Sequence, residues 1–189
     1  MDEFQKVKKK VISKLQGLSP ELTYHCLNHT LDVLEQSIRI AAEERVVDQR
    51  ALYLLKIAAL YHDTGFLRSY TDHEVKSCEI FLADSTEYCL TTEEKSVIVN
   101  LIMATRIPQR PSSLLEQIIC DADLDYLGRD DFFSIGDNLR KEFQLFGVVA
   151  DDEEWEQMQL KFILNHQYHT LSSRKLREPA KQFNFTKLV

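Results

Sequence analysis

His62 and Asp63 stand side by side at the end of the apolar segment LKIAALYHDTGF. Titratable side chains among apolar residues lose hydration, which is costly unless a partner compensates the loss. A further histidine, His29, lies in the segment YHCLNHTLDVL. The segment IICDADLDYLG carries three aspartates: Asp121, Asp123 and Asp125. One metal ion held by imidazole and carboxylate groups from these segments would compensate the lost hydration of these side chains.

Two imidazoles and two carboxylates form a mixed nitrogen and oxygen donor set. Such a set suits a divalent ion such as Mn, Fe, Co, Ni or Zn and differs from the all-oxygen environment of calcium. Taken singly, a helical histidine more often caps a helix, forms a hydrogen bond or faces solvent. The combination of these residue types in one chain therefore carries the prediction of a metal site.

The order of these residues, with His29 first, then His62 and Asp63, then a distant aspartate, resembles the HD superfamily of metal-dependent phosphohydrolases. The resemblance covers about residues 24–133, including DHEVKSCEIFL and IICDADLDYLGRDDF. Over this range the sequence is similar to a bacterial group of stand-alone HD proteins. The resemblance implies an all-helical bundle that binds one divalent ion, with Mn, Fe, Co, Ni, Zn and Mg as candidates. It also implies that His29, His62, Asp63 and one later aspartate are the metal ligands.

Two aspartates compete for the last ligand position. Asp123 is followed by Leu124 and resembles the aspartate-leucine pair of other HD proteins, whereas Asp121 lies one helical turn from Asp125. We favour Asp123 and keep Asp121 as the alternative. The aspartate that does not bind the ion would orient a ligand from outside the coordination shell.

A second resemblance concerns His25. The segment YHCLNH is similar to the pattern of a tyrosine, a histidine, three residues and a histidine in cyclic-nucleotide phosphodiesterases, which are distant HD relatives. The resemblance implies that His25 protonates the leaving oxygen. The predicted catalytic residues are therefore His25 and, from the metal site, Asp63. Four positions separate His25 from His29, which predicts one shared helix face. The rest of the phosphodiesterase pattern is absent, and a surface histidine beside Tyr24 is the alternative.

His73 and Glu74 in TDHEVKSCE follow the central motif and are predicted to line the substrate pocket, with a helix cap as the alternative. Some HD enzymes bind a second metal through histidines in the helix that here reads NLIMATRIP. This chain has Met103 and Thr105 there instead, which favours a single ion.

Phosphate chemistry also needs positive charge near the phosphoryl oxygens. Arg106 and Arg110 in ATRIPQRP are the predicted substrate-binding cations, although arginines in such positions are more often solvated. Three apolar residues recur at helical spacing further along and are expected in the core rather than as a nucleobase platform: Trp155, Met158 and Phe162.

The elements that must position these residues read as helices. Apolar residues recur every three or four positions, and the chain has only five Gly and four Pro, so we predict one all-α domain over residues 1–189. Its motif core would cover about residues 24–133, with the C-terminal helices packing on it. Ser19, Pro20 and Glu21 predict the start of a helix that carries both His25 and His29. Further helices are expected over residues 48–64, 72–83, 91–107, 113–127, 131–146 and 151–169.

The two ends of the chain are less regular. The segment MDEFQKVKKKVISKL has apolar residues at helical spacing among lysines, which fits an amphipathic membrane helix or, as we favour, a helix docked on the protein surface. The tail after Pro179 is expected to be a docked or frayed end rather than a domain.

Composition excludes several partners. The formal net charge of -7 argues against binding of a nucleic acid polymer, which is driven by neutralisation of phosphates. The sequence has no apolar run near the roughly 20 residues of a membrane span and no signal-peptide centre at its start. Its four cysteines form no CxxC pair. We therefore expect a cytoplasmic protein with no membrane partner, and whether it forms a homodimer stays open.

The leading functional hypothesis is a metal-dependent phosphohydrolase. It would hydrolyse a phosphoester of a nucleotide or of another small phosphorylated metabolite, with metal-activated water as the nucleophile. The nearest alternative is a cyclic-nucleotide phosphodiesterase. A regulatory module that binds a metal and a nucleotide without turnover is an alternative of another class.

Overall fold

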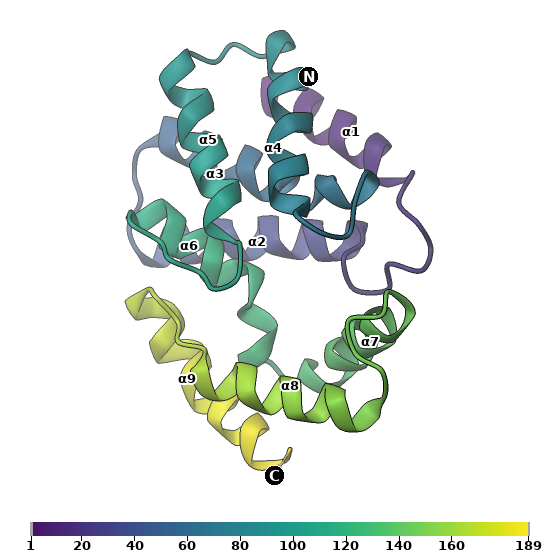
Figure 1. Cartoon of the computed structure of the whole chain (residues 1–189). Coiled ribbons are helices and arrows are strands. Elements are labelled where there is room, and N and C mark those ends of the chain that lie inside the picture. The colour runs from purple at the N-terminus through teal and green to yellow at the C-terminus, as the bar shows by residue number, and fades with distance from the viewer. Residues whose placement is uncertain (1, 189) are drawn as a thin grey trace.

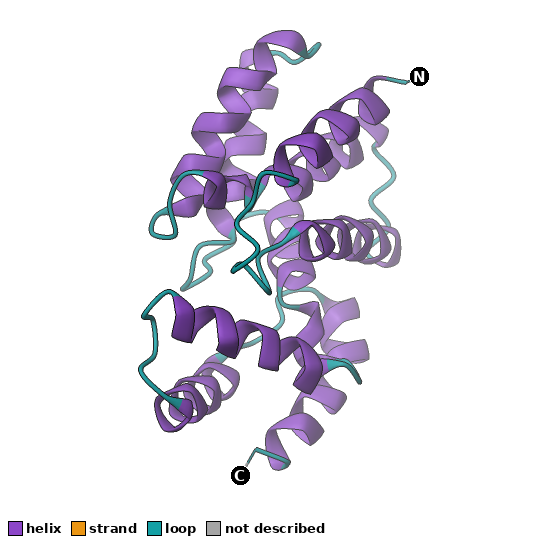
Figure 2. Ribbon diagram, turned by 90° about the vertical axis from the view of Figure 1, so that its right-hand side faces the viewer, coloured by secondary structure: helices purple, strands orange, loops and turns teal. Residues whose placement is uncertain are grey.

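The computed structural model describes residues 2–188 of the chain. Within that range the chain folds into nine α-helices and three short 3-10 helices and contains no strand, which confirms the all-α prediction (Figures 1 and 2). The α-helices are α1 (Glu3–Leu15), α2 (Leu27–Glu43), α3 (Gln49–Tyr61), α4 (His73–Asp84), α5 (Thr92–Ala104), α6 (Leu114–Asp123), α7 (Phe132–Leu145), α8 (Asp152–Asn165) and α9 (Leu171–Thr186). The 3-10 helices are η1 (Thr64–Leu67), η2 (Ser85–Glu87) and η3 (Asp125–Gly128).

Helix α3 lies at the centre of the first six helices. It is apolar on almost every side, and its residues from Ile57 to Tyr61 are fully buried. A helix with this pattern must be surrounded by other elements, and here it packs against α1, α2, α5 and α6. The C-terminal end of α3, where the histidine and aspartate pair follows, is therefore held in the interior.

Helices α7, α8 and α9 lie together on the far side of α2 and α6, in the lower part of Figure 1. A second apolar cluster, which includes Leu124, Tyr126 and Ile163, joins them to the segment around η3. The buried carboxylate of Asp125 fixes this arrangement, because it accepts hydrogen bonds from Arg177 of α9 at 2.8 and 3.0 Å and from Arg39 of α2 at 2.7 Å.

Several predicted helix starts are confirmed. Asp48 accepts hydrogen bonds from the first backbone N–H groups of α3, and Thr91 and Glu94 form the expected capping box of α5. Helix α1 docks through Val7, Val11 and Leu15, all buried, as favoured from the sequence. No helix in the described part of the chain has the length and apolar character that a membrane span requires.

The expected start of the helix that carries His29 is wrong. Helix α2 begins at Leu27, not near Ser19, so His25 precedes the helix that carries His29. The tail after Pro179, expected to be a docked or frayed end, is docked, because α9 continues through Pro179 to Thr186. Buried Asn184 holds that last part of α9 in place by donating to the carbonyl groups of Leu127 and Arg129 at 3.1 Å.

Candidate metal centre and its pocket

The end of α3 directs two successive side chains into one interior space. His62 keeps helical backbone angles, whereas Asp63 leaves the helix at φ -108° and ψ 6°. Gly65 allows the following turn to lie against α4, since a Cβ atom at this position would meet the carbonyl oxygen of His73 at 1.8 Å. Ser77 of α4 fixes the turn by donating to the carbonyl of His62 at 2.6 Å and accepting from the N–H of Gly65 at 2.8 Å.

Four side chains converge beyond this turn. His29 Nε2 lies 3.1 Å from Asp123 Oδ1 and 3.3 Å from Asp63 Oδ2. His62 Nε2 lies 3.2 Å from Asp63 Oδ2, 3.5 Å from Asp123 Oδ1 and 3.4 Å from His29 Nε2. These residues come from α2, the end of α3 and the last position of α6, so three helices build the cluster.

The donor set fits a divalent cation. The Nδ1 atom of His62 lies 2.8 Å from the carbonyl of Ala59, and the hydrogen bond between them requires a proton on Nδ1. That proton leaves the Nε2 lone pair directed at the cluster, as in histidine ligands of metals. The buried Oδ2 atom of Asp63 has no hydrogen-bond partner in the described structure. A cation among these four groups would satisfy this oxygen.

The electrostatics of the cluster also favour positive charge. Burial alone would lower the pKa of His29, but Asp123 and Asp63 raise it to about 9. Burial acts in the opposite direction on Asp123, and the two histidines outweigh it and hold the pKa of Asp123 at about 2. His62 and His29 likewise outweigh burial and hold the pKa of Asp63 well below its usual value, so both carboxylates stay ionised at neutral pH.

Asp121, the alternative ligand, lies outside this cluster. Its carboxylate accepts hydrogen bonds from the backbone N–H groups of His169 and Thr170, at 2.7 and 2.8 Å, and from the Thr170 hydroxyl at 2.7 Å. Residues two positions apart on a helix do not share a face, so Asp121 and Asp123 point to different neighbours. The alternative assignment of Asp121 is corrected: it anchors the start of α9.

His25 reaches the same region from the segment before α2. Its Nδ1 atom contacts the buried carboxylate of Glu142 in α7, which also accepts the N–H groups of Tyr24 and His25 at 2.8 and 3.0 Å. Burial raises the pKa of Glu142, but His25 and the two N–H groups outweigh this effect and hold the pKa below its usual value. The His25 ring stacks on Phe66 of η1, with ring centroids 4.3 Å apart.

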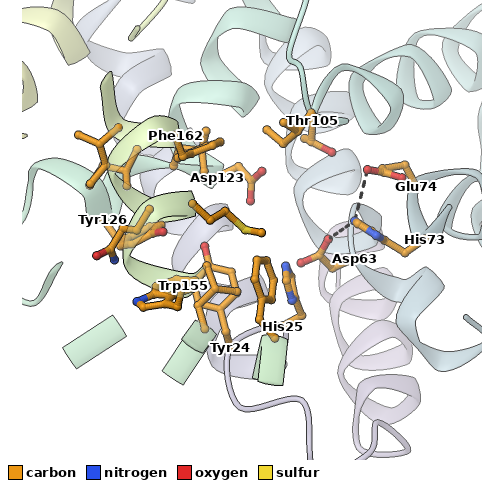
Figure 3. Close-up of a pocket in the computed structure, with 18 residues that line it drawn as sticks. Tyr24, His25, Asp63, His73, Glu74, Thr105, Asp123, Tyr126, Trp155 and Phe162 are labelled. Carbon is orange, nitrogen blue, oxygen red and sulfur yellow. Dashed lines mark ion pairs between the residues drawn. The ribbon is translucent and has the colours of Figure 1, made fainter. Parts of the chain in front are cut away.

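A chamber with a cavity volume of about 170 Å³, open on one side, adjoins the cluster. Figure 3 shows Asp63, His73 and Glu74 on one side of it and Tyr126, Trp155 and Phe162 on the other. His73 Nε2 lies 3.6 Å from Asp63 Oδ1 and 3.5 Å from Glu74 Oε1. His73 and Glu74 thus both line the chamber, and their contact with a substrate stays a prediction.

The predicted arginines lie elsewhere. Arg106 is exposed and pairs with Asp72 at 2.6 Å, and Arg110 is exposed on the same surface segment. Neither of them lines the chamber. Their prediction as phosphate-binding residues is corrected, because the loop after α5 turns both side chains to solvent.

A comparison with protein families agrees with this geometry. The family model described as HD domain matches residues 26–125, which is more than half of the chain. The chain belongs to the HD-domain family. No curated protein and no solved structure matches it. The matched range of the HD domain contains His29, His62, Asp63 and Asp123 and ends before α7.

The helices outside the matched range contribute residues that sequence reasoning missed. Glu142 was not singled out, although it follows Ile135 and Leu139 at helical spacing on the apolar face of α7. A carboxylate on such a face is a signal of a buried partner. Trp155, Met158 and Phe162 were expected in the core. Trp155 is buried and Phe162 packs on the second apolar cluster, and all three also line the chamber beside the HD-domain cluster.

Proposed function

We propose that this HD-domain protein is a metal-dependent phosphohydrolase that hydrolyses a phosphoester of a nucleotide or of another small phosphorylated metabolite. One observation carries the proposal: His29, His62, Asp63 and Asp123 converge at the wall of a chamber, and no hydrogen bond satisfies the buried Oδ2 atom of Asp63. The HD family, whose members are metal-dependent phosphohydrolases, supports the reaction class.

The four residues of the cluster would hold the ion through His29 Nε2, His62 Nε2, Asp63 Oδ2 and Asp123 Oδ1. When bound, a divalent ion supplies Lewis acidity, which activates water for attack and offsets charge on the phosphoryl oxygens. Asp63 also presents Oδ1 toward His73 at the chamber wall, where it can accept a hydrogen bond from the attacking water.

His25 is the proposed general acid. Its Nδ1 atom faces Glu142, which keeps the ring in one orientation and leaves Nε2 as the second proton-carrying atom. Because His25 lines the same chamber as Asp63 and Asp123, a leaving oxygen held there would lie near the imidazole. Protonation of that oxygen lets the alcohol depart neutral.

The first test is metal content followed by phosphate release. Metal-free protein is loaded with Mn, Co, Ni or Mg and assayed with mono-, tri- and cyclic nucleotides and with other monoesters. We expect about one ion per chain and metal-dependent release from one substrate class. Turnover of a cyclic diester alone would favour the phosphodiesterase. Bound ion without any turnover would favour the regulatory module, and a protein that binds no ion would refute the site.

A further inference from the structure

The wall of the chamber away from the metal cluster is largely apolar. Helix α8 contributes Trp155, Met158 and Phe162 together with the uncharged Gln159, and α7 contributes Leu139 and Phe143. Trp155 is 7% exposed and meets Phe143 edge to face, with ring centroids 5.7 Å apart. The contact fixes the indole as part of the wall, so the space beside it is shaped by aromatic and aliphatic groups.

The charged side chains of the chamber are gathered at its other side. The carboxylates there are Asp63, Glu74 and Asp123, accompanied by His25 and His73. Among the described residues, those that line the chamber include no lysine and no arginine. A second phosphoryl group would therefore lie against apolar side chains without a cation, and this burial of unpaired charge is costly.

Beyond this wall lies an outer groove with a mixed lining of apolar and polar residues. Met158 and Phe162 also border this groove, whose lining includes Gln109, Lys161 and Asn165. Met158 and Phe162 thus lie between the chamber and the outer groove.

We propose that the chamber binds the uncharged, apolar or aromatic body of a phosphoester that carries a single phosphoryl group. This inference rests on the proposed hydrolase function and names its substrate class. Water and the ester would give inorganic phosphate and an alcohol, with the phosphoryl group at the cluster and the alcohol's body against Trp155. Nucleoside di- and triphosphates are poor substrates in this assignment.

The single tryptophan of the chain makes chamber binding measurable without turnover. Metal-free protein is titrated with benzyl alcohol and, in parallel, with glycerol, while Trp155 fluorescence is recorded. We expect a saturable change with benzyl alcohol only. The loaded enzyme is then assayed with benzyl phosphate, glycerol phosphate and ATP, and we expect kcat/KM to be about tenfold or more higher for benzyl phosphate.

A matched pair of variants on α8 tests the wall itself. Met158→Glu adds a charge to the chamber, whereas Leu164→Glu adds the same charge at a position that is 72% exposed and outside the chamber. We expect Met158→Glu to abolish the benzyl alcohol response and the preference for benzyl phosphate, and Leu164→Glu to keep both. If Met158→Glu fails to fold, Met158→Gln is used instead. We expect Met158→Gln to weaken the benzyl alcohol response and the preference for benzyl phosphate.

The outcomes separate a failure of the apolar binding site from a failure of the hydrolase proposal. Equal responses to benzyl alcohol and glycerol, or faster hydrolysis of ATP than of benzyl phosphate, would overturn the assignment. A benzyl alcohol response that Met158→Glu removes, together with no hydrolysis of any ester, would uphold the apolar binding site and refute the hydrolase.

Discussion

The Nδ1 atom of His25 contacts the carboxylate of Glu142, which lies 117 positions later in the chain. The same carboxylate accepts the N–H groups of Tyr24 and His25, so these groups need no helical carbonyl partners. This explains why α2 begins only at Leu27. The orientation of His25 thus depends on α7 rather than on its spacing from His29.

Replacement of Glu142 by Gln should impair the acid without removing the metal. The amide keeps the volume of the carboxylate but loses the charge that orients His25, so we expect turnover to fall by about tenfold or more. The loss should be larger for alkyl phosphates than for nitrophenyl phosphates, because only poor leaving groups need protonation. Turnover and metal content are measured on the same preparation.

Tyr70→Phe is the matched control for this change. Tyr70 donates to the same carboxylate at 3.0 Å, and its loss leaves the contact with His25 in place. We expect little change in the dependence on the leaving group. An equal loss for both ester types in Glu142→Gln would assign the residue a structural role only.

Asp121 and Asp123 provide a second test, because they are two positions apart on α6 and have different partners. We expect Asp123→Asn to lose the metal and the activity and to keep its helical circular dichroism. Asp121→Asn should keep the metal but lower the free energy of unfolding by about 1–3 kcal/mol, since it weakens the buried hydrogen bonds to Thr170. Loss of metal from Asp121→Asn with unchanged stability would reverse the assignment.

The parts of the fold that the sequence predicted depend on local patterns. The apolar run of α3, its end at the HD pair and the capping box of Thr91 and Glu94 are formed by residues close in the chain. The family motif, with His29 followed by His62 and Asp63, predicted that these three side chains converge, because members of one family share the contacts between their helices.

The parts that it missed depend on contacts between distant segments. The start of α2 is set by Glu142 from α7, and the continuation of α9 through Pro179 is held by contacts with the segment around η3. The partners of Asp121 and Arg106 could not be predicted either, because residue type alone does not say which neighbour a side chain at a helix end or in a loop contacts.

Because of their positions, replacement of Arg106 or Arg110 should have little effect on activity. Both are exposed, and Arg106 is already paired with exposed Asp72. Because exposed pairs contribute little free energy, Arg106→Ala and Arg110→Ala should each change kcat/KM by no more than about twofold. Steady-state kinetics on the preferred substrate checks this. A tenfold rise in KM for either variant would restore the arginine to the substrate site.

His166 predicts how stability depends on pH. Its Nδ1 atom lies 3.3 Å from the Nζ atom of buried Lys181, which also pairs with Glu178. Burial lowers the pKa of His166 to about 3, and the charges of Lys181 and His169 act in the same direction. The unfolded chain has the ordinary value near 6.5 and therefore binds a proton that the folded protein does not.

The stabilising contribution of neutral His166 is thus present above pH 6.5 and is lost as the pH falls toward 3. We expect the free energy of unfolding to drop through this residue by at most about 1.4 kcal/mol for each pH unit below the unfolded value. Urea unfolding of the wild type and of His166→Asn at several pH values between 7 and 4 measures the difference. The variant should lose less stability on acidification, because its side chain does not titrate and still offers Lys181 an acceptor, whereas parallel pH profiles would show that His166 protonates equally in both states.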